Sequence, residues 1–110
     1  MVERLDMTFA ALADPTRRAM LVQLRHGERS VGELAAPFAM SFAGAAKHLG
    51  VLERAGLVER RKAGRHQLCR LRAAPMAEAD AWLRQWESFW NTRLDRLEVL
   101  IGTQEDKPHD

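Results

Sequence analysis

The chain has 110 residues, of which 46% are hydrophobic and 29% charged, a balance typical of one soluble globular domain. It contains no apolar run near the ~18 residues of a transmembrane helix, and the start MVERLDMTF lacks the apolar segment of a secretion signal, so we expect no membrane association. The single cysteine, Cys69, excludes an internal disulfide framework and fits a reducing compartment, so we expect a cytoplasmic protein.

The charge is small overall but unevenly placed. The net charge is +2, yet the segment from Lys47 to Arg72 holds eight cations and two acids, a local charge of +6. A basic segment on a near-neutral chain is typical of a polyanion-binding surface. The alternative at this point is an ordinary solvated face.

The first two helices are predicted from apolar periodicity and from a strong start signal. The apolar stripe of the first helix, over residues 2–13, consists of Val2, Leu5, Phe9 and Leu12. Asp14 and Pro15 are typical of an N-cap and of a first helical position. We therefore expect a second helix from Pro15 to about His26 that stops at Gly27.

Two further helices are predicted close together, joined by a tight turn. The sequence SVGE at 30–33 is a capping box, in which Ser30 and Glu33 cap the same helix start reciprocally. Pro37 removes a backbone donor, so this third helix is expected to be short. Ser41 then caps a fourth helix, which ends where Gly56 suits a left-handed residue in a Schellman motif.

A basic hairpin and a long helix complete the chain. The strands LVERRKA and HQLCRLR are joined by a turn at Gly64-Arg65, and Pro75 opens a helix over about 75–101. One broad face of that helix is apolar: Ala79, Trp82, Leu83, Trp86, Phe89, Trp90, Leu94, Leu97 and Ile101. A short helix-turn-helix followed by a hairpin predicts a mainly α fold with a small β-hairpin, the winged helix-turn-helix.

The fourth helix divides into two faces when residues 41–56 are projected. The packing face is expected to hold Ala45, Leu49, Leu52 and, less centrally, His48, with Gly44 at its border, allowing close packing on the third helix. The opposite face is expected to hold Phe42, Ala43, Ala46, Lys47, Gly50 and Arg54.

At this point the chain resembles the ArsR-type bacterial repressors. The matching segments are ALADPTRRAMLVQL (11–24), SVGELAAPFAMS (30–41), KHLGVLERAGLVERRKAGR (47–65) and WLRQWESFWNTRLDRLEVL (82–100). The resemblance implies a transcriptional repressor, which would bind a two-fold symmetric operator in double-stranded DNA as a homodimer. The sequence contains no nucleophile elbow, phosphate loop or metal-catalysis motif, so we expect no enzymatic activity. Residues 1–101 would form the DNA-binding and dimerisation domain, and 102–110 a flexible polar tail.

A recognition helix places its N-terminal residues at base edges in the major groove, while a basic wing contacts the backbone or the minor groove. The predicted DNA-binding residues are Ser41, Phe42, Ala43, Ala46, Lys47, His48, Arg60, Arg61, Lys62, Arg65 and His66. The family often has polar residues at two of these positions, where Phe42 and Ala46 stand, so we expect readout through thymine methyls and DNA shape. His48 either orients the helix or holds a phosphate, with base reading as the alternative.

The resemblance also implies a dimer built from the first and last helices. Its predicted contacts are Leu5, Phe9, Trp82, Trp86, Phe89, Trp90, Leu94 and Leu97. The alternative function is a winged-helix module that docks a protein on its tryptophan-rich last helix; five cations on the hairpin argue against that module.

We expect no metal and no cofactor. ELAAPF lacks the Cys-x-Cys of thiolate sensors, and the last helix contains no histidine. Cys69 is expected to be a small, half-buried apolar residue and not a redox switch.

Overall fold

The computed structural model describes residues 2–102, and the side chains of residues 3–101. The chain divides into two compact units, one ending at Ala79 and one beginning at Asp80. Of the predicted tail 102–110, Gly102 is the last residue of a helix, and residues 103–110 lie outside the described part of the chain. The elements in chain order are α1 (Val2–Leu12), α2 (Pro15–Leu24), β1 (Arg29–Ser30), α3 (Val31–Ala35), α4 (Phe42–Arg54), β2 (Val58–Ala63), β3 (His66–Leu71), α5 (Ala74–Arg84) and α6 (Glu87–Gly102).

The three predicted helix starts are confirmed by their capping hydrogen bonds. Asp14 Oδ2 accepts from the backbone N–H of Arg17 at 3.0 Å. Ser30 Oγ accepts from the N–H of Glu33 at 3.1 Å, and the Glu33 carboxylate accepts from the N–H of Ser30 at 2.8 Å, which completes the capping box. Ser41 caps α4 in the same way through the N–H of Gly44 at 3.0 Å. Each side chain satisfies a donor that has no partner within its helix.

The end of α4 is the predicted Schellman motif. Gly56 has φ +80°, a left-handed conformation that glycine adopts without a Cβ penalty. Its N–H donates to the carbonyl of Glu53 and the next N–H, of Leu57, donates to the carbonyl of Leu52, both at 2.9 Å. The chain therefore passes directly from α4 into β2.

The second helix is shorter than the predicted span to His26. It ends at Leu24, because the following N–H groups of His26 and Gly27 bond three residues back, to Gln23 and Leu24. Such bonds tighten the last turn and end the α-helical ladder. Gly27 follows with φ +130°.

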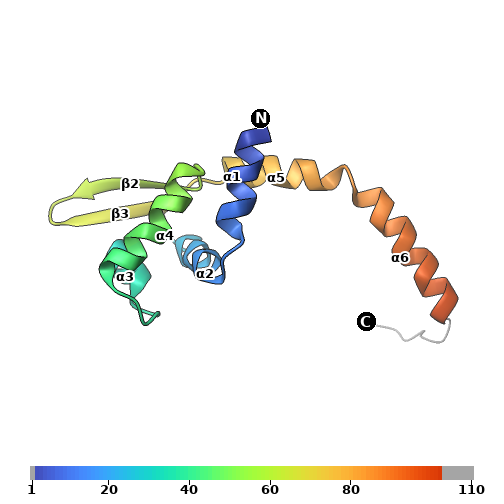
Figure 1. The fold of residues 1–110 in the computed structure, drawn as a ribbon, viewed down its shortest axis with the longest axis horizontal. Helices are drawn as coiled ribbons and strands as arrows, with labels where there is room; N and C mark the ends of the chain where they lie inside the picture. The colour runs from blue at the N-terminus through green and yellow to red at the C-terminus, as the bar shows by residue number, and fades with distance from the viewer. Residues whose placement is uncertain (1, 103–110) are drawn as a thin grey trace. The chain divides into compact units, whose positions relative to one another are not determined.

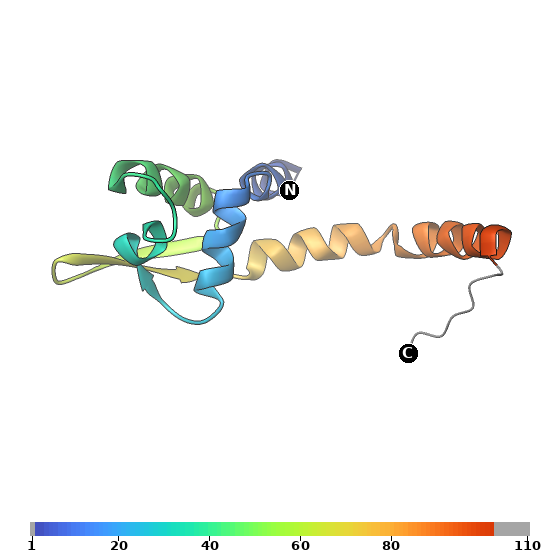
Figure 2. The same ribbon diagram turned by 90° about the horizontal axis from the view of Figure 1, so that it is seen from below.

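The hairpin belongs to a three-stranded antiparallel sheet in the order β1-β3-β2. Sequence reasoning missed β1, because a strand of two residues leaves no alternation to detect. The register pairs Arg60 with Cys69 and Ala63 with His66, around the turn where Gly64 has φ +62°. Within the first unit the hairpin extends beyond the helices (Figures 1 and 2).

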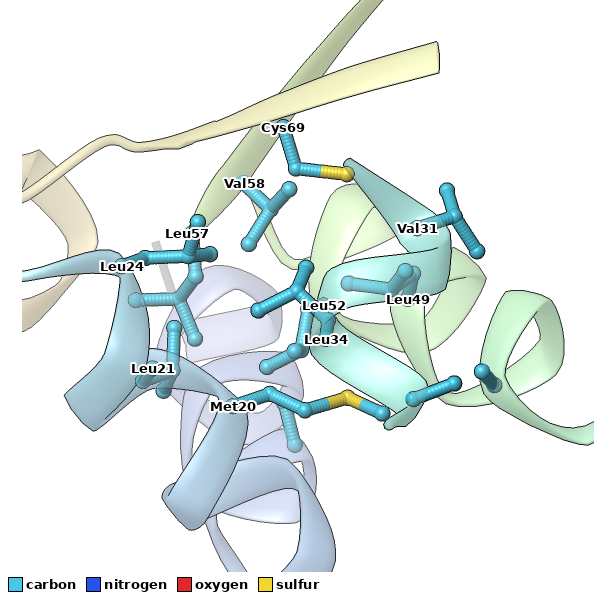
Figure 3. Close-up of a cluster of buried hydrophobic side chains, with 13 residues drawn as sticks. Met20, Leu21, Leu24, Val31, Leu34, Leu49, Leu52, Leu57, Val58 and Cys69 are labelled. Atoms are coloured by element: carbon cyan, nitrogen blue, oxygen red, sulfur yellow. The ribbon is translucent and has the colours of Figure 1, made fainter. Parts of the chain in front are cut away.

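The core of the first unit lies between the helices and the base of the sheet (Figure 3). Its largest fully buried side chains are Met20, Val31, Leu34, Leu49, Leu52, Leu57 and Cys69, together with Thr8. The buried positions of α1 are Thr8 and Ala11, whereas Phe9 of the predicted stripe is 37% exposed. Thr8 is accommodated because its hydroxyl donates to the carbonyl of Arg4.

The prediction of one long helix over 75–101 is wrong. Helix α5 ends at Arg84 and α6 begins at Glu87, because the N–H groups of Gln85 and Trp86 bond three residues back, to Trp82 and Leu83. The break involves neither proline nor glycine. It precedes ESFWNT at 87–92, where serine, aromatic, asparagine and threonine residues of modest helix propensity follow one another.

Candidate nucleic-acid interface

Helix α4 buries one face and exposes the other at its N-terminal end. Ala45, Leu49 and Leu52 are fully buried, as the helical projection predicts. On the other side Ser41, Phe42, Ala43 and Lys47 are exposed and Ala46 is half-buried. Phe42 is 62% exposed, an unusual position for an aromatic ring on a free surface. The exposed end therefore offers small apolar groups, one aromatic ring and one cation.

The role predicted for Gly44 is wrong. A Cβ at this position would meet Ser41 Oγ at 3.4 Å and Met40 Cβ at 3.8 Å, and no atom of α3 within 4 Å. A Cβ would make only ordinary contacts near the N-cap of its own helix, so a close approach of α3 does not explain the glycine.

His48 is half-buried and faces the start of α2. Its Nδ1 lies 3.3 Å from Nη1 of Arg17 and 3.8 Å from Oδ2 of Asp14. The carboxyl pKa of Asp14 is lowered, chiefly by the hydrogen bond from the backbone N–H of Arg17. Sequence reasoning missed Arg17. Its signal was a cation in the first turn of a helix, where the helix dipole disfavours positive charge.

Ion pairs hold two of the predicted wing cations within the protein. Arg60 on β2 donates from Nε and Nη2 to one oxygen of Glu53 on α4, at 3.2 and 2.9 Å. Arg61 on the same strand pairs with Glu28, before β1, at 3.0 Å. The sequence did not predict that Glu53 and Glu28 pair with these arginines. Residues so far apart in the chain become neighbours only in the folded structure.

A third carboxylate binds two arginines of the same hairpin. Glu59 accepts from Nε of Arg70 at 2.8 Å and lies 3.5 Å from Nη1 of Arg72. The hydrogen bond from Arg70 is the main reason that the pKa of Glu59 is lowered. These contacts connect β2 to β3, through Arg70, and to Arg72, which follows β3.

Three predicted cations form no ion pair within residues 2–102: Lys47, Lys62 and Arg65. All three are exposed, as is His66. Lys47 lies on α4, whereas Lys62 and Arg65 lie at and beside the hairpin turn. Arg54 of α4, which was not among the predicted DNA-binding residues, is also exposed and forms no ion pair in the described part of the chain. The structure thus divides the basic segment into cations that fasten the wing and cations that remain available to a polyanion.

The second unit carries a row of exposed apolar side chains. Leu94 and Leu97 of α6 are 57% and 53% exposed, and Trp86 and Phe89 are 44% and 52% exposed. The Trp86 ring lies 5.9 Å from that of Trp82 and 6.1 Å from that of Phe89. Trp90 is 40% exposed. Contiguous apolar surface of this kind is characteristic of an interaction face.

Cys69 is more deeply placed than the predicted half-buried position. Its side chain is fully buried in β3, and burial raises the pKa of the thiol. Both features disfavour the thiolate, which is the reactive form of cysteine. The apolar role predicted for Cys69 is therefore confirmed.

Residues 2–102 bring no three histidine, cysteine or carboxylate side chains together in a way that would hold a metal ion. None of the helices there has both the length and the apolar character of a membrane span.

Comparisons with known sequences agree with this arrangement. The helix-turn-helix domain family matches residues 12–61. The chain is 37% identical over 101 residues to the HTH-type transcriptional regulator Rv2034 of Mycobacterium tuberculosis, covering 92% of each protein. It is 27% identical over 79 residues to the transcriptional repressor SdpR of Bacillus subtilis, covering 72% of this chain and 88% of SdpR.

Solved structures show the same fold. The ArsR family transcriptional regulator RHA00566 superposes with a TM-score of 0.77 at 40% identity, over 83% of this chain and 94% of that one. The homodimeric winged helix-turn-helix DNA-binding domain of Mb0332 from Mycobacterium bovis superposes with a TM-score of 0.62 at 26% identity, over 98% and 90%. The chain therefore belongs to the ArsR family of winged helix-turn-helix transcriptional regulators, DNA-binding proteins that are not enzymes.

Proposed function

We propose that this protein is a cytoplasmic repressor that binds a two-fold symmetric operator as a homodimer. Helix α4 would enter the major groove, and the β2–β3 hairpin would contact the backbone and the minor groove. The observation that carries this proposal is the group of unpaired, exposed cations on α4 and the hairpin: Lys47, Lys62 and Arg65. Similarity to the repressor SdpR supports the negative sense of regulation.

The exposed end of α4 supports a mixed mode of recognition. Phe42, Ala43 and Ala46 supply apolar contacts for thymine methyl groups. Lys47 would contact a guanine edge or a phosphate. Ser41 accepts a hydrogen bond from its own helix, so its hydroxyl proton remains available to a phosphate oxygen.

The exposed apolar row supports the homodimer. The proposed interface comprises Leu5, Phe9, Trp82, Trp86, Phe89, Trp90, Leu94 and Leu97. Mb0332, a similar domain, is homodimeric. Light scattering is expected to give the mass of a dimer at micromolar concentration, and Leu94→Glu, which puts a charge on the exposed row, is expected to give the monomer. A monomeric wild type would contradict this assembly.

The DNA-binding proposal is tested by the salt dependence of affinity for the DNA upstream of the gene. Neutralising one phosphate contributes ~0.9 to the slope of log K against log salt, so removing one cation from each protomer of a dimer is expected to reduce the slope by about 1.8. Lys62→Ala and Arg65→Ala should each produce this reduction. Arg84→Ala, which removes a cation paired with Asp80 on α5, is the control that should not.

Base reading is tested separately by substitutions on α4. Ala46→Asp and Lys47→Ala are expected to weaken operator binding more than about twofold, while binding to scrambled DNA changes less for Ala46→Asp. If neither substitution reaches twofold, this face of α4 does not read the operator. A two-fold symmetric footprint is expected on the operator, and its absence together with salt-insensitive binding would favour a protein-docking module.

A further inference from the structure

Arg17, in the first turn of α2, contacts two other helices with its guanidinium group. Its Nε donates to the carbonyl of Ala11 at 2.8 Å, and its Nη2 donates to the carbonyl of Ala10 at 3.1 Å. Both carbonyls lie in the last turn of α1. The carbonyl of Ala10 also accepts from the N–H of Ala13, at 3.2 Å. The third group, Nη1, lies 3.3 Å from Nδ1 of His48 on α4. Arg17 therefore connects the end of α1 and the start of α2 to the recognition helix.

This contact determines which nitrogen of His48 carries the proton. A guanidinium group donates hydrogen bonds and accepts none, so Nδ1 must be the acceptor. A neutral imidazole with an accepting Nδ1 carries its hydrogen on Nε2. Asp14 does not reverse this assignment, because its Oδ2 lies 3.8 Å from Nδ1, beyond hydrogen-bond distance, and accepts from the N–H of Arg17.

The second nitrogen of His48 remains available for a ligand. Nε2 has no hydrogen-bond partner in the described part of the chain, and the side chain is 27% exposed. His48 directly follows Lys47, which is exposed and unpaired. An oriented N–H donor beside a cation, in the middle of α4, has the chemistry of a phosphate contact.

We infer that Arg17 is a positioning residue for DNA binding, which holds His48 in the Nε2–H form so that it donates a hydrogen bond to a phosphate oxygen of the operator. This inference rests on the proposed function, since it needs DNA at α4. Arg17 itself contacts no DNA in this arrangement. Its effect passes through the imidazole.

The neighbouring Arg18 provides a matched control. It also closes the end of α1, through Nη1 and the carbonyl of Leu12 at 2.8 Å, but it makes no contact with His48. Arg17→Met and Arg18→Met therefore remove the same charge and a comparable helix-end contact. Only Arg17→Met removes the partner of His48.

The first measurement follows the imidazole without DNA. Nitrogen-15 NMR of histidine-labelled protein at neutral pH is expected to show the Nε2–H tautomer for His48 in the wild type and in Arg18→Met, and a mixture of tautomers in Arg17→Met. The His48→Asn spectrum assigns the signal by its loss. An Nδ1–H form in the wild type, or identical spectra for both arginine variants, would overturn the inference.

The second measurement uses amide side chains that imitate one ring nitrogen each. The amide of His48→Gln reaches the place of Nε2, whereas that of His48→Asn reaches the place of Nδ1. We expect His48→Gln to bind the operator within about threefold of the wild type and His48→Asn to lose on the order of tenfold or more, since hydrogen bonds to charged groups are the stronger ones. Full affinity in His48→Asn, with loss in His48→Gln, would show that the ring acts only through Nδ1 as a structural link.

The salt slope separates this neutral donor from a cationic contact. Removal of a neutral donor releases no counterion, so His48→Asn is expected to weaken binding with an unchanged slope, unlike Lys62→Ala. A reduced slope for His48→Asn would overturn the neutral-donor assignment. If the wild type binds operator and scrambled DNA with equal affinity, the proposed function is wrong, and the phosphate contact is wrong with it. The NMR measurement still tests the Arg17–His48 contact in that case.

Discussion

Replacing Gly56 with alanine tests how the recognition helix is connected to the wing. Gly56 has φ +80°, and an L-residue forced into left-handed backbone costs roughly 1–2 kcal/mol. A Cβ would lie 3.4 Å from Cγ of Pro75, at the short end of ordinary contact, so the expected cost comes from the backbone conformation. We therefore expect Gly56→Ala to lower the free energy of unfolding by about 1–2 kcal/mol, which for a domain of this size lowers Tm by about 4–16 °C.

The same substitution inside α4 should change the free energy of unfolding in the opposite direction. Gly50 lies inside the helix, where a Cβ would have ordinary contact with the flexible Arg54 side chain at 3.5 Å. Glycine in a helix interior destabilises by roughly 0.5–1 kcal/mol relative to alanine, so Gly50→Ala should raise the free energy of unfolding by that amount. Comparison of Gly56→Ala with Gly50→Ala therefore separates the effect of the left-handed backbone from the general effect of replacing glycine with alanine.

Urea unfolding at one fixed protein concentration measures both variants, because the stability of a dimer depends on concentration. The midpoint is expected to fall for Gly56→Ala and to rise for Gly50→Ala, with unchanged m values. If Gly56→Ala is as stable as the wild type, or if both variants shift in the same direction by the same amount, the left-handed cap does not hold this connection.

Three further predictions concern single groups of the sheet. Native protein at pH 8 should react with a thiol reagent at Cys69 only as fast as the structure opens, and at once in denaturing urea; rapid stoichiometric labelling of the native state would contradict the burial. A double-mutant cycle with Arg60→Met and Glu53→Gln should give a coupling of about 0.2–1 kcal/mol, since the two side chains remain 22% and 40% exposed and solvent screens the pair; additive effects would show that the pair contributes nothing. Because the folded-state pKa of Glu59 is lowered from 4.5, its stabilisation is present above about pH 4.5 and is lost as pH falls through the lower value, so the stability difference between wild type and Glu59→Gln should shrink on acidification; a difference that grows toward acid would refute the sign.

The local features of the fold followed directly from the sequence. Caps at Asp14, Ser30 and Ser41, and the left-handed Gly56, depend on side chains and backbone within a few residues, so the sequence alone predicts them. The buried and exposed faces of α4 were also predictable from the sequence, because helical periodicity assigns Ala45, Leu49 and Leu52 to the core.

The features that sequence reasoning missed depend on tertiary partners. Strand β1 exists because Arg29 and Ser30 pair with β3. Two residues are too few for a sequence pattern that would predict this pairing. Periodicity also continued through the break after Arg84, because an apolar stripe persists even where the backbone ladder changes. The number of charges in the basic segment predicted that its net charge is positive. It did not predict which of its cations form ion pairs with carboxylates elsewhere in the fold.

The division into paired and unpaired cations bears on how helix α4 and the β2–β3 hairpin would act together. Arg60 joins β2 to Glu53 near the end of α4, and the cap at Gly56 fixes the turn between them, so helix and wing base are held as one body. A cation already paired within the protein changes the counterion balance less on binding than an unpaired one. Among the predicted DNA-binding residues, we therefore expect Lys47, Lys62 and Arg65 to account for the salt dependence of the proposed DNA binding. The paired arginines would then determine where the wing lies against the phosphates.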